Sequence, residues 1–169
     1  MKIAVGCDHI VTDIKNQIID YLKAEGHEVL DMGTYDHKRT HYPIFGRKVG
    51  QAVALKKADL GIVLCGTGVG ISNACNKVPF IRCALVNDPV SAKNAREKLD
   101  ANVLAVGGRV AGMGMIEDII DTFLTASYKG ENDEIIQELN AMAWNEDVLY
   151  NEELFDVFLK KWDEGYYHD

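Results

Sequence analysis

Short apolar runs alternate with helix-like segments along the first 126 residues of this chain, and this alternation limits the folds open to it. Each apolar run is short enough for a buried strand, and the segments between the runs repeat apolar residues at helical spacing or carry helix-start and helix-stop signals. Strands separated by helices are typical of a parallel sheet with helices on both faces. The expected strands are residues 2–7, 27–33, 59–65, 81–86 and 102–108.

The helices expected between these strands have recognisable ends. One runs over 12–25 and closes at Gly26, and a second begins at Pro43, which suits a first turn. A short helix is expected around 72–76, one capped by Ser91 runs to Leu99, and one covers 115–126. The predicted fold is therefore α/β: a Rossmann-like, three-layer α/β/α arrangement around a five-stranded parallel sheet.

Residues 131–169 differ in composition from the rest. They hold 12 of the 26 acidic residues and 2 of the 18 basic ones, so the net charge of −8 comes from this segment. Nucleic acid is a poor partner for such a chain. Two helices are expected here, over 133–144 and 152–162. With no Pro/Ser-rich linker, we predict one domain over 1–169, with an α/β core over 1–130 and a helical C-terminal extension over 131–169. No signal peptide or membrane-length apolar run is present, so a cytoplasmic location is expected.

Polar residues follow each expected strand, and parallel sheets bind ligands at these carboxyl ends. The groups concerned are Asp8 and His9, Thr34 to Arg39, Cys65 to Gly70, Asn87 and Asp88, and Gly107 to Arg109. The third of these, Cys-Gly-Thr-Gly-Val-Gly, is the most informative.

Several kinds of site use a glycine loop after a strand. A dinucleotide fingerprint fits in part, because Gly66 and Gly68 are in place and Asp88 mimics the ribose-binding acid, but Ile71 stands where the third glycine belongs. A P-loop is excluded, because no Gly-Lys-Ser/Thr follows the glycines. A cysteine phosphatase needs an arginine to close the loop, and Ile71 cannot serve.

The remaining hypothesis is a reactive cysteine in an anion hole. Backbone N–H groups at the start of the following helix favour negative charge, which predicts a lowered pKa for the Cys65 thiol. Such a thiolate can take a proton from carbon while the amides and the Thr67 hydroxyl hold the resulting oxyanion. A structural cysteine fits the loop equally well. Asp8 and His9 at the same edge, and Arg39 as a phosphate ligand, favour the reactive one. Cys75 and Cys83 are expected to be inert buried thiols, and without a CxxC pair no zinc site is expected.

The segments "KIAVGCDH", "GTYDHKRTHYP", "ADLGIVLCGTGVGISNACNK", "IRCAL" and "NVLAVGGRVAG" together resemble the ribose-5-phosphate isomerase B/galactose-6-phosphate isomerase family from Met1 to about Gly130. The resemblance implies aldose–ketose isomerisation through an enediolate, without metal or cofactor. It implies Cys65 as the proton-transfer base and Thr67 with the amides of the loop as oxyanion stabilisers; these loop residues are Gly66, Gly68, Val69 and Gly70. Asp8, His9 and Arg39 match substrate-binding positions, and Tyr42 lines the same cleft.

Two departures from the family pattern point to a partner. A histidine–asparagine pair that opens the sugar ring is replaced by Lys98 and Leu99, and two phosphate-binding arginines by Asn132 and Ile136. "RTHYPIFG", "FLKKWDEGYYHD" and the extension are similar to the B-subunit branch of the galactose enzyme, a heteromer. The resemblance therefore implies a galactose-6-phosphate isomerase A subunit that supplies the missing groups. A ribose-5-phosphate or allose-6-phosphate isomerase, and a non-catalytic sugar-phosphate-binding subunit, remain open.

Overall fold

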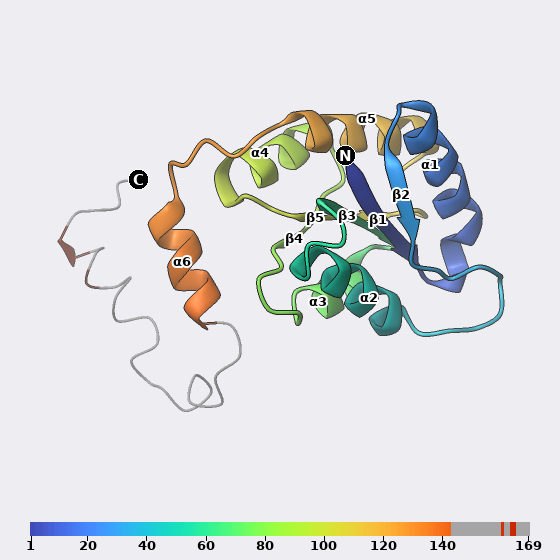
Figure 1. Cartoon of the computed structure of the whole chain (residues 1–169), viewed down its shortest axis with the longest axis horizontal. Coiled ribbons are helices and arrows are strands. Elements are labelled where there is room, and N and C mark those ends of the chain that lie inside the picture. The colour runs from blue at the N-terminus through green and yellow to red at the C-terminus, as the bar shows by residue number, and fades with distance from the viewer. Residues whose placement is uncertain (143–159, 161–162, 165–169) are drawn as a thin grey trace.

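The computed structural model describes residues 1–142, 160 and 163–164, and its centre is a five-stranded parallel sheet (Figure 1). The strands lie in the order β2-β1-β3-β5-β4, and every neighbouring pair is parallel. Their bounds are β1 Lys2–Cys7, β2 Glu28–Asp31, β3 Leu60–Cys65, β4 Cys83–Leu85 and β5 Val103–Gly107. The predicted α/β class, sheet and strand number are confirmed.

Helices cover both faces of the sheet and complete the three predicted layers. Their bounds are α1 Thr12–Ala24, α2 Tyr42–Ala54, α3 Val69–Cys75, α4 Pro89–Leu99, α5 Met113–Thr125 and α6 Asp133–Met142. One layer contains α1, α4 and α5, and the other contains α2 and α3. In Figure 1, α6 stands apart from the sheet, beside α4 and the β4 end.

Successive side chains of the central strands enter opposite cores, as a pleated strand requires. In β3, Ile62 and Leu64 pack with α1, α4 and α5, whereas Val63 and Cys65 pack with α2 and α3. The strands are apolar throughout because both of their faces are buried. Cys65 consequently ends its strand on the α2–α3 side of the sheet.

Two predicted helix starts are wrong. The helix after the glycine loop begins at Val69 rather than near Ser72, because Gly68 already adopts a left-handed φ of 80° and turns the chain into α3. The cap of α4 is Asp88 and not Ser91: the Asp88 carboxylate accepts the N–H of Ser91 at 2.8 Å and its hydroxyl at 2.7 Å. This capping occupies the carboxylate that a dinucleotide site would have used for the ribose.

The extension is described only in part. Its first predicted helix, 133–144, is observed as α6, Asp133–Met142, and Trp144 lies outside the described residues. Most of the second predicted helix, 152–162, also lies outside them. In the part of the chain that the structure describes, none of the helices has the length and apolar character needed to cross a membrane.

Candidate active site

The carboxyl ends of β1 and β3 meet at the centre of the sheet, where the chain turns from one direction of strand addition to the other. Ligands of open α/β sheets bind at such a switch point. Asp8 directly follows β1, and Cys65 is the last residue of β3. The thiol of Cys65 donates a hydrogen bond to Asp8 Oδ2 at 3.1 Å. Two predicted site residues that are 57 positions apart in the sequence are thus in direct contact.

The loop after Cys65 holds its shape because glycines allow close backbone approach. A Cβ atom on Gly68 would lie 2.5 Å from Leu85 Cδ1 and 3.0 Å from the Val106 carbonyl carbon, and its φ of 80° also favours glycine. At Gly70, a Cβ atom would come within 2.8 Å of the Tyr42 ring. Tyr42 therefore packs directly against the loop at Gly70.

The turn after β5 clamps the same loop from the other side. The N–H groups of Gly108 and Arg109 donate to the carbonyl oxygens of Cys65 and Gly66 at 2.9 and 3.0 Å. A Cβ atom on Gly107 would lie 2.8 Å from the Thr67 carbonyl oxygen. The sequence analysis placed Gly107 to Arg109 at this edge of the sheet but did not predict that they support the loop.

The electrostatics of Cys65 correct one prediction. The pKa of its thiol is raised rather than lowered, first because the side chain is buried and then because it donates to the Asp8 carboxylate, whose charge opposes a second negative charge. Hydrogen bonds from the backbone of Gly68 and Thr67 lower the pKa, as the anion-hole hypothesis expected, but they are outweighed. Sequence reasoning considered the loop amides and omitted the carboxylate beside the sulfur.

The remaining predicted residues have fewer contacts at this edge. The Thr40 N–H donates to His9 Nδ1 at 3.3 Å, which ties the loop before α2 to the end of β1. Arg39 belongs to that loop and is exposed, and among the described residues no contact joins it to Cys65. The Thr67 hydroxyl oxygen accepts a hydrogen bond from the Val69 N–H at 3.4 Å, and both residues are exposed.

Lys98, Asn132 and Ile136, the positions at which the resemblance implies ring-opening and phosphate-binding residues in other family members, are engaged within this chain. Lys98 forms an ion pair with Glu131, and this hydrogen bond raises the pKa of the lysine, which keeps it protonated. The Asn132 side chain donates to the Lys98 carbonyl oxygen at 2.8 Å, and its N–H donates to the Tyr128 hydroxyl. Ile136 is 8 % exposed. Lys98, Asn132 and Ile136 therefore stabilise contacts within this chain.

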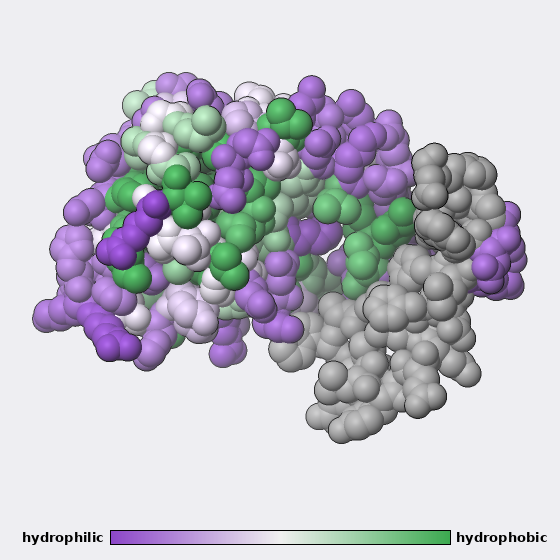
Figure 2. Space-filling model, turned by 180° about the vertical axis from the view of Figure 1, so that it is seen from behind, coloured by the Kyte–Doolittle hydropathy of each residue, from purple (hydrophilic) through white to green (hydrophobic). Residues whose placement is uncertain are grey.

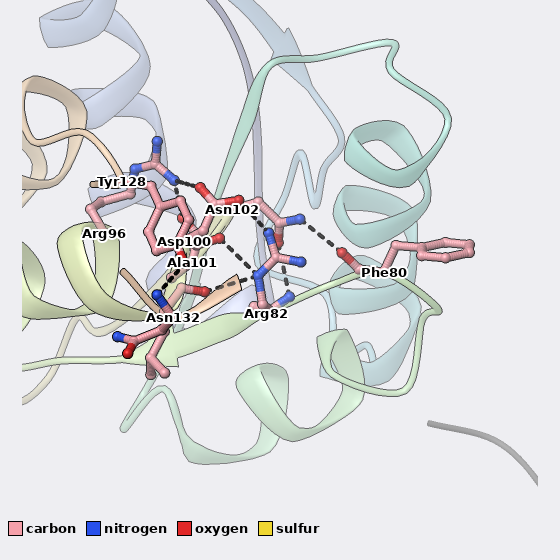
Figure 3. Close-up of polar contacts among 9 residues, drawn as sticks. Phe80, Arg82, Arg96, Asp100, Ala101, Asn102, Tyr128 and Asn132 are labelled. Carbon is pink, nitrogen blue, oxygen red and sulfur yellow. Dashed lines mark hydrogen bonds and ion pairs between the residues drawn. The ribbon is translucent and has the colours of Figure 1, made fainter. Parts of the chain in front are cut away.

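A polar network next to these positions fixes the segment between α4 and β5 (Figure 3). Asp100, at the end of α4, binds Arg82 at 2.7 Å and Arg96 at 2.9 Å. The Asn102 side chain accepts the Arg82 N–H and donates to the Phe80 carbonyl oxygen. The backbone around Leu99 is therefore held in place, and the exposed Leu99 side chain offers no polar group.

Neither a metal centre nor a reactive second cysteine emerges from the described residues. No group of His, Cys, Asp and Glu in this part of the chain could hold a metal ion. Cys75 and Cys83 are buried, as predicted, and contact with the Cys75 thiol raises the pKa of Cys83.

Comparison with known proteins decides the relationship. The family model described as Ribose/Galactose Isomerase matches residues 3–139. The chain belongs to the ribose/galactose isomerase family. It is an enzyme of the aldose–ketose isomerase class, as predicted.

Three relatives show how far this similarity extends. A protein of Clostridium acetobutylicum named galactose-6-phosphate isomerase subunit LacB is 56% identical, over 99% of this chain and 98% of its own length. Ribose-5-phosphate isomerase B of Escherichia coli is 46% identical over 76% of this chain and 87% of its own. The structure of ribose-5-phosphate isomerase B from Clostridium thermocellum superposes on this chain with a TM-score of 0.83 at 44% identity. The superposition covers 84% of this chain and 97% of the clostridial chain. The similarity to LacB thus includes the C-terminal extension.

Proposed function

We propose that this chain is the B subunit of a galactose-6-phosphate isomerase, which interconverts D-galactose 6-phosphate and D-tagatose 6-phosphate. The observation that carries the proposal is the Cys65 thiol at the switch point of the sheet, beside Asp8 and followed by a glycine loop. The near full-length similarity to LacB supports the choice of substrate.

In the proposed reaction, Cys65 carries one proton between the two carbons that change oxidation state. The thiolate removes the proton from C2 of the open-chain aldose, and the electron pair moves to the carbonyl oxygen to give a cis-enediolate. The N–H groups of the loop and the Thr67 hydroxyl hold that oxygen. The thiol returns the proton to C1 while the proton of the O2 hydroxyl is transferred to O1, which leaves a carbonyl group at C2 and a hydroxyl group at C1. Asp8, His9, Arg39 and Tyr42 bind the substrate.

We also propose that an A subunit completes the site. The described part of the chain offers no histidine near position 98, and no arginine at 132 or 136. Apolar side chains are exposed within four residues of the ends of three adjacent strands, at Ile10, Val69 and Val110, which suits a protein interface. The partner would cover this edge and supply the ring-opening histidine–asparagine pair and the phosphate-binding arginines.

A second apolar surface supports a multisubunit enzyme. Phe80, Leu99 and Leu139 line a groove of about 310 Å³ between α6 and the segments around β4. Seen from behind, the region of α6 carries hydrophobic surface (Figure 2). The side chains of Phe80, Leu99 and Leu139 are all exposed. Exposed apolar groups gathered around one groove mark an interaction site more often than isolated ones do.

A non-catalytic sugar-phosphate-binding subunit is the second candidate function, because the raised pKa of Cys65 keeps its thiol protonated in the free chain, and a protonated thiol cannot remove a proton from carbon. Deuterium exchange separates the two. An equimolar mixture with an A subunit should incorporate deuterium from heavy water at C1 or C2 of the sugar phosphate. Cys65→Ala should slow this incorporation at least about 100-fold, the usual scale for a proton-transfer group, with substrate binding retained.

Cys75→Ala is the matched control, because this second thiol lies at the far end of α3 and is fully buried. It should exchange deuterium at nearly the normal rate. Exchange that continues undiminished in Cys65→Ala would remove Cys65 from the mechanism and leave the binding subunit as the better account.

A further inference from the structure

The Asp8 carboxylate is fixed at both of its oxygen atoms. Its Oδ1 accepts the Ile10 N–H at 2.9 Å, and its Oδ2 accepts the Cys65 thiol at 3.1 Å. Asp8 is 3 % exposed and Cys65 is 9 % exposed, so water screens this contact very little. The carboxylate cannot turn away without losing the hydrogen bond that caps the short 3₁₀ helix His9–Val11 after β1.

We propose that Asp8 acts in the reaction through Cys65: in the free chain it is a positioning residue that holds the sulfur as a neutral S–H donor. A hydrogen bond from sulfur to a carboxylate requires the proton to be on sulfur. A thiolate at the same place would put two negative charges in contact inside a buried crevice. The backbone N–H groups of Thr67 and Gly68 favour the thiolate, but their effect is smaller than that of burial and the Asp8 charge together.

The other charged groups at this edge do not relieve that repulsion in the free chain. His9 follows Asp8, and its Nδ1 is occupied by the Thr40 N–H. Arg109 follows β5 and passes beside Gly66, and among the described residues no contact joins it to the sulfur. Lys15 is buried near Cys7, but its ammonium binds both oxygens of Asp31 at 2.6 Å.

Release of the thiol then needs another donor for Asp8 Oδ2. On the proposed function, on which this step rests, that donor is a hydroxyl group of the sugar phosphate. When the hydroxyl binds Oδ2, the S–H bond breaks, its electron pair stays on sulfur, and the proton passes to water. The base would thus form in the loaded site, while the thiol of the empty site stays in its unreactive form.

The test is the pH dependence of Cys65 alkylation in the purified free chain. Iodoacetamide reacts with thiolate, so the modification rate of the Cys65 peptide, followed by mass spectrometry, reports the midpoint of thiol ionisation. In Asp8→Asn the amide oxygen can keep the Ile10 N–H bond, and the NH₂ group becomes a donor to sulfur. We expect the midpoint to fall by at least about one pH unit.

Asp88→Asn is the matched control, because its carboxylate lies at the same edge of the sheet and binds Ser91 instead of a thiol. Its midpoint should equal that of the unmodified chain. An Asp8→Asn midpoint that also equals that of the unmodified chain would overturn the proposal.

A second measurement needs no variant that must fold. The Cys65 midpoint of the unmodified chain, measured folded and then unfolded in urea, should be higher in the folded state. A folded midpoint at or below the unfolded one contradicts the proposal. Neither measurement uses a sugar phosphate or an A subunit, so a failure of the proposed isomerase function would leave these results unchanged and can be recognised separately.

Discussion

Gly68 is the residue on which the geometry of the glycine loop depends most. Its left-handed backbone turns the chain from β3 into α3, and the space where a side chain would begin is filled by Leu85 and the backbone of β5. Gly66, two residues earlier, is different: a Cβ atom there would meet its nearest neighbours at 3.8 Å, which is ordinary contact. Position 68 therefore requires glycine, whereas position 66 has room for a small side chain.

Gly68→Ala should lower the free energy of unfolding by about 1–3 kcal/mol, the usual scale for overpacking and for a strained backbone, and should reduce isomerase activity in the assembled enzyme. Gly66→Ala should cost less than about 0.5 kcal/mol, as for a substitution that meets no close contact. Urea titration followed by circular dichroism measures both. Equal losses for the two variants would contradict this description of the loop.

The residue types of the site could be predicted from the sequence, but their electrostatics could not. Cys65, Asp8 and His9 stand at the ends of recognisable strands, so their shared edge follows from the alternation of strands and helices. The hydrogen bond from Cys65 to Asp8 depends on how two strands pair, and the burial of the thiol depends on packing by α2 and α3. Both raise its pKa, whereas the loop taken alone predicted a lowered one.

Among the elements, α6 gives the clearest physical reason why this chain departs from the family pattern. Ile136 faces inward from this helix and is buried, at the position for which the resemblance implies a phosphate-binding arginine in other family members. Gln137 is the next residue and is exposed. A charge at 136 would lose its hydration, whereas a charge at 137 would keep it.

Ile136→Arg should therefore lower the free energy of unfolding by about 2–4 kcal/mol, and Gln137→Arg by less than about 0.5 kcal/mol. Thermal unfolding monitored by calorimetry compares them directly. If Ile136→Arg were as stable as Gln137→Arg, the isoleucine would not be a packing residue, and its place in the structure could not explain the missing arginine.

The elements themselves were largely predictable, and the errors concern their ends. Strand positions follow from apolar runs that are buried on both faces, and Pro43 lies in the first turn of α2 as expected. The start of α3 was placed too late because a left-handed glycine is not distinguished from other glycines by sequence alone. The cap of α4 was predicted at Ser91, whereas Asp88 caps this helix; both residue types are common helix caps, so residue type alone does not choose between them.

At the scale of the whole molecule, the described chain resembles one side of an active site. The thiol, its carboxylate and the glycine loop are assembled at the centre of the sheet, while Lys98, Asn132 and Ile136 are committed to contacts within the chain. Exposed apolar residues border the first region, as expected for a surface that another protein covers. The sequence predicted this division from missing residue types, and the structure adds what occupies their places.

The most direct measurement of this account is the rate of galactose 6-phosphate isomerisation by the chain alone, by an A subunit alone, and by the two mixed. The account predicts that the mixture is active and that each chain alone reaches no more than about 1 % of its rate, because an oriented proton-transfer base without its ring-opening and phosphate-binding groups loses about 100-fold or more. A purified chain that isomerises galactose 6-phosphate by itself as fast as the mixture would contradict the central claim that its active site is shared.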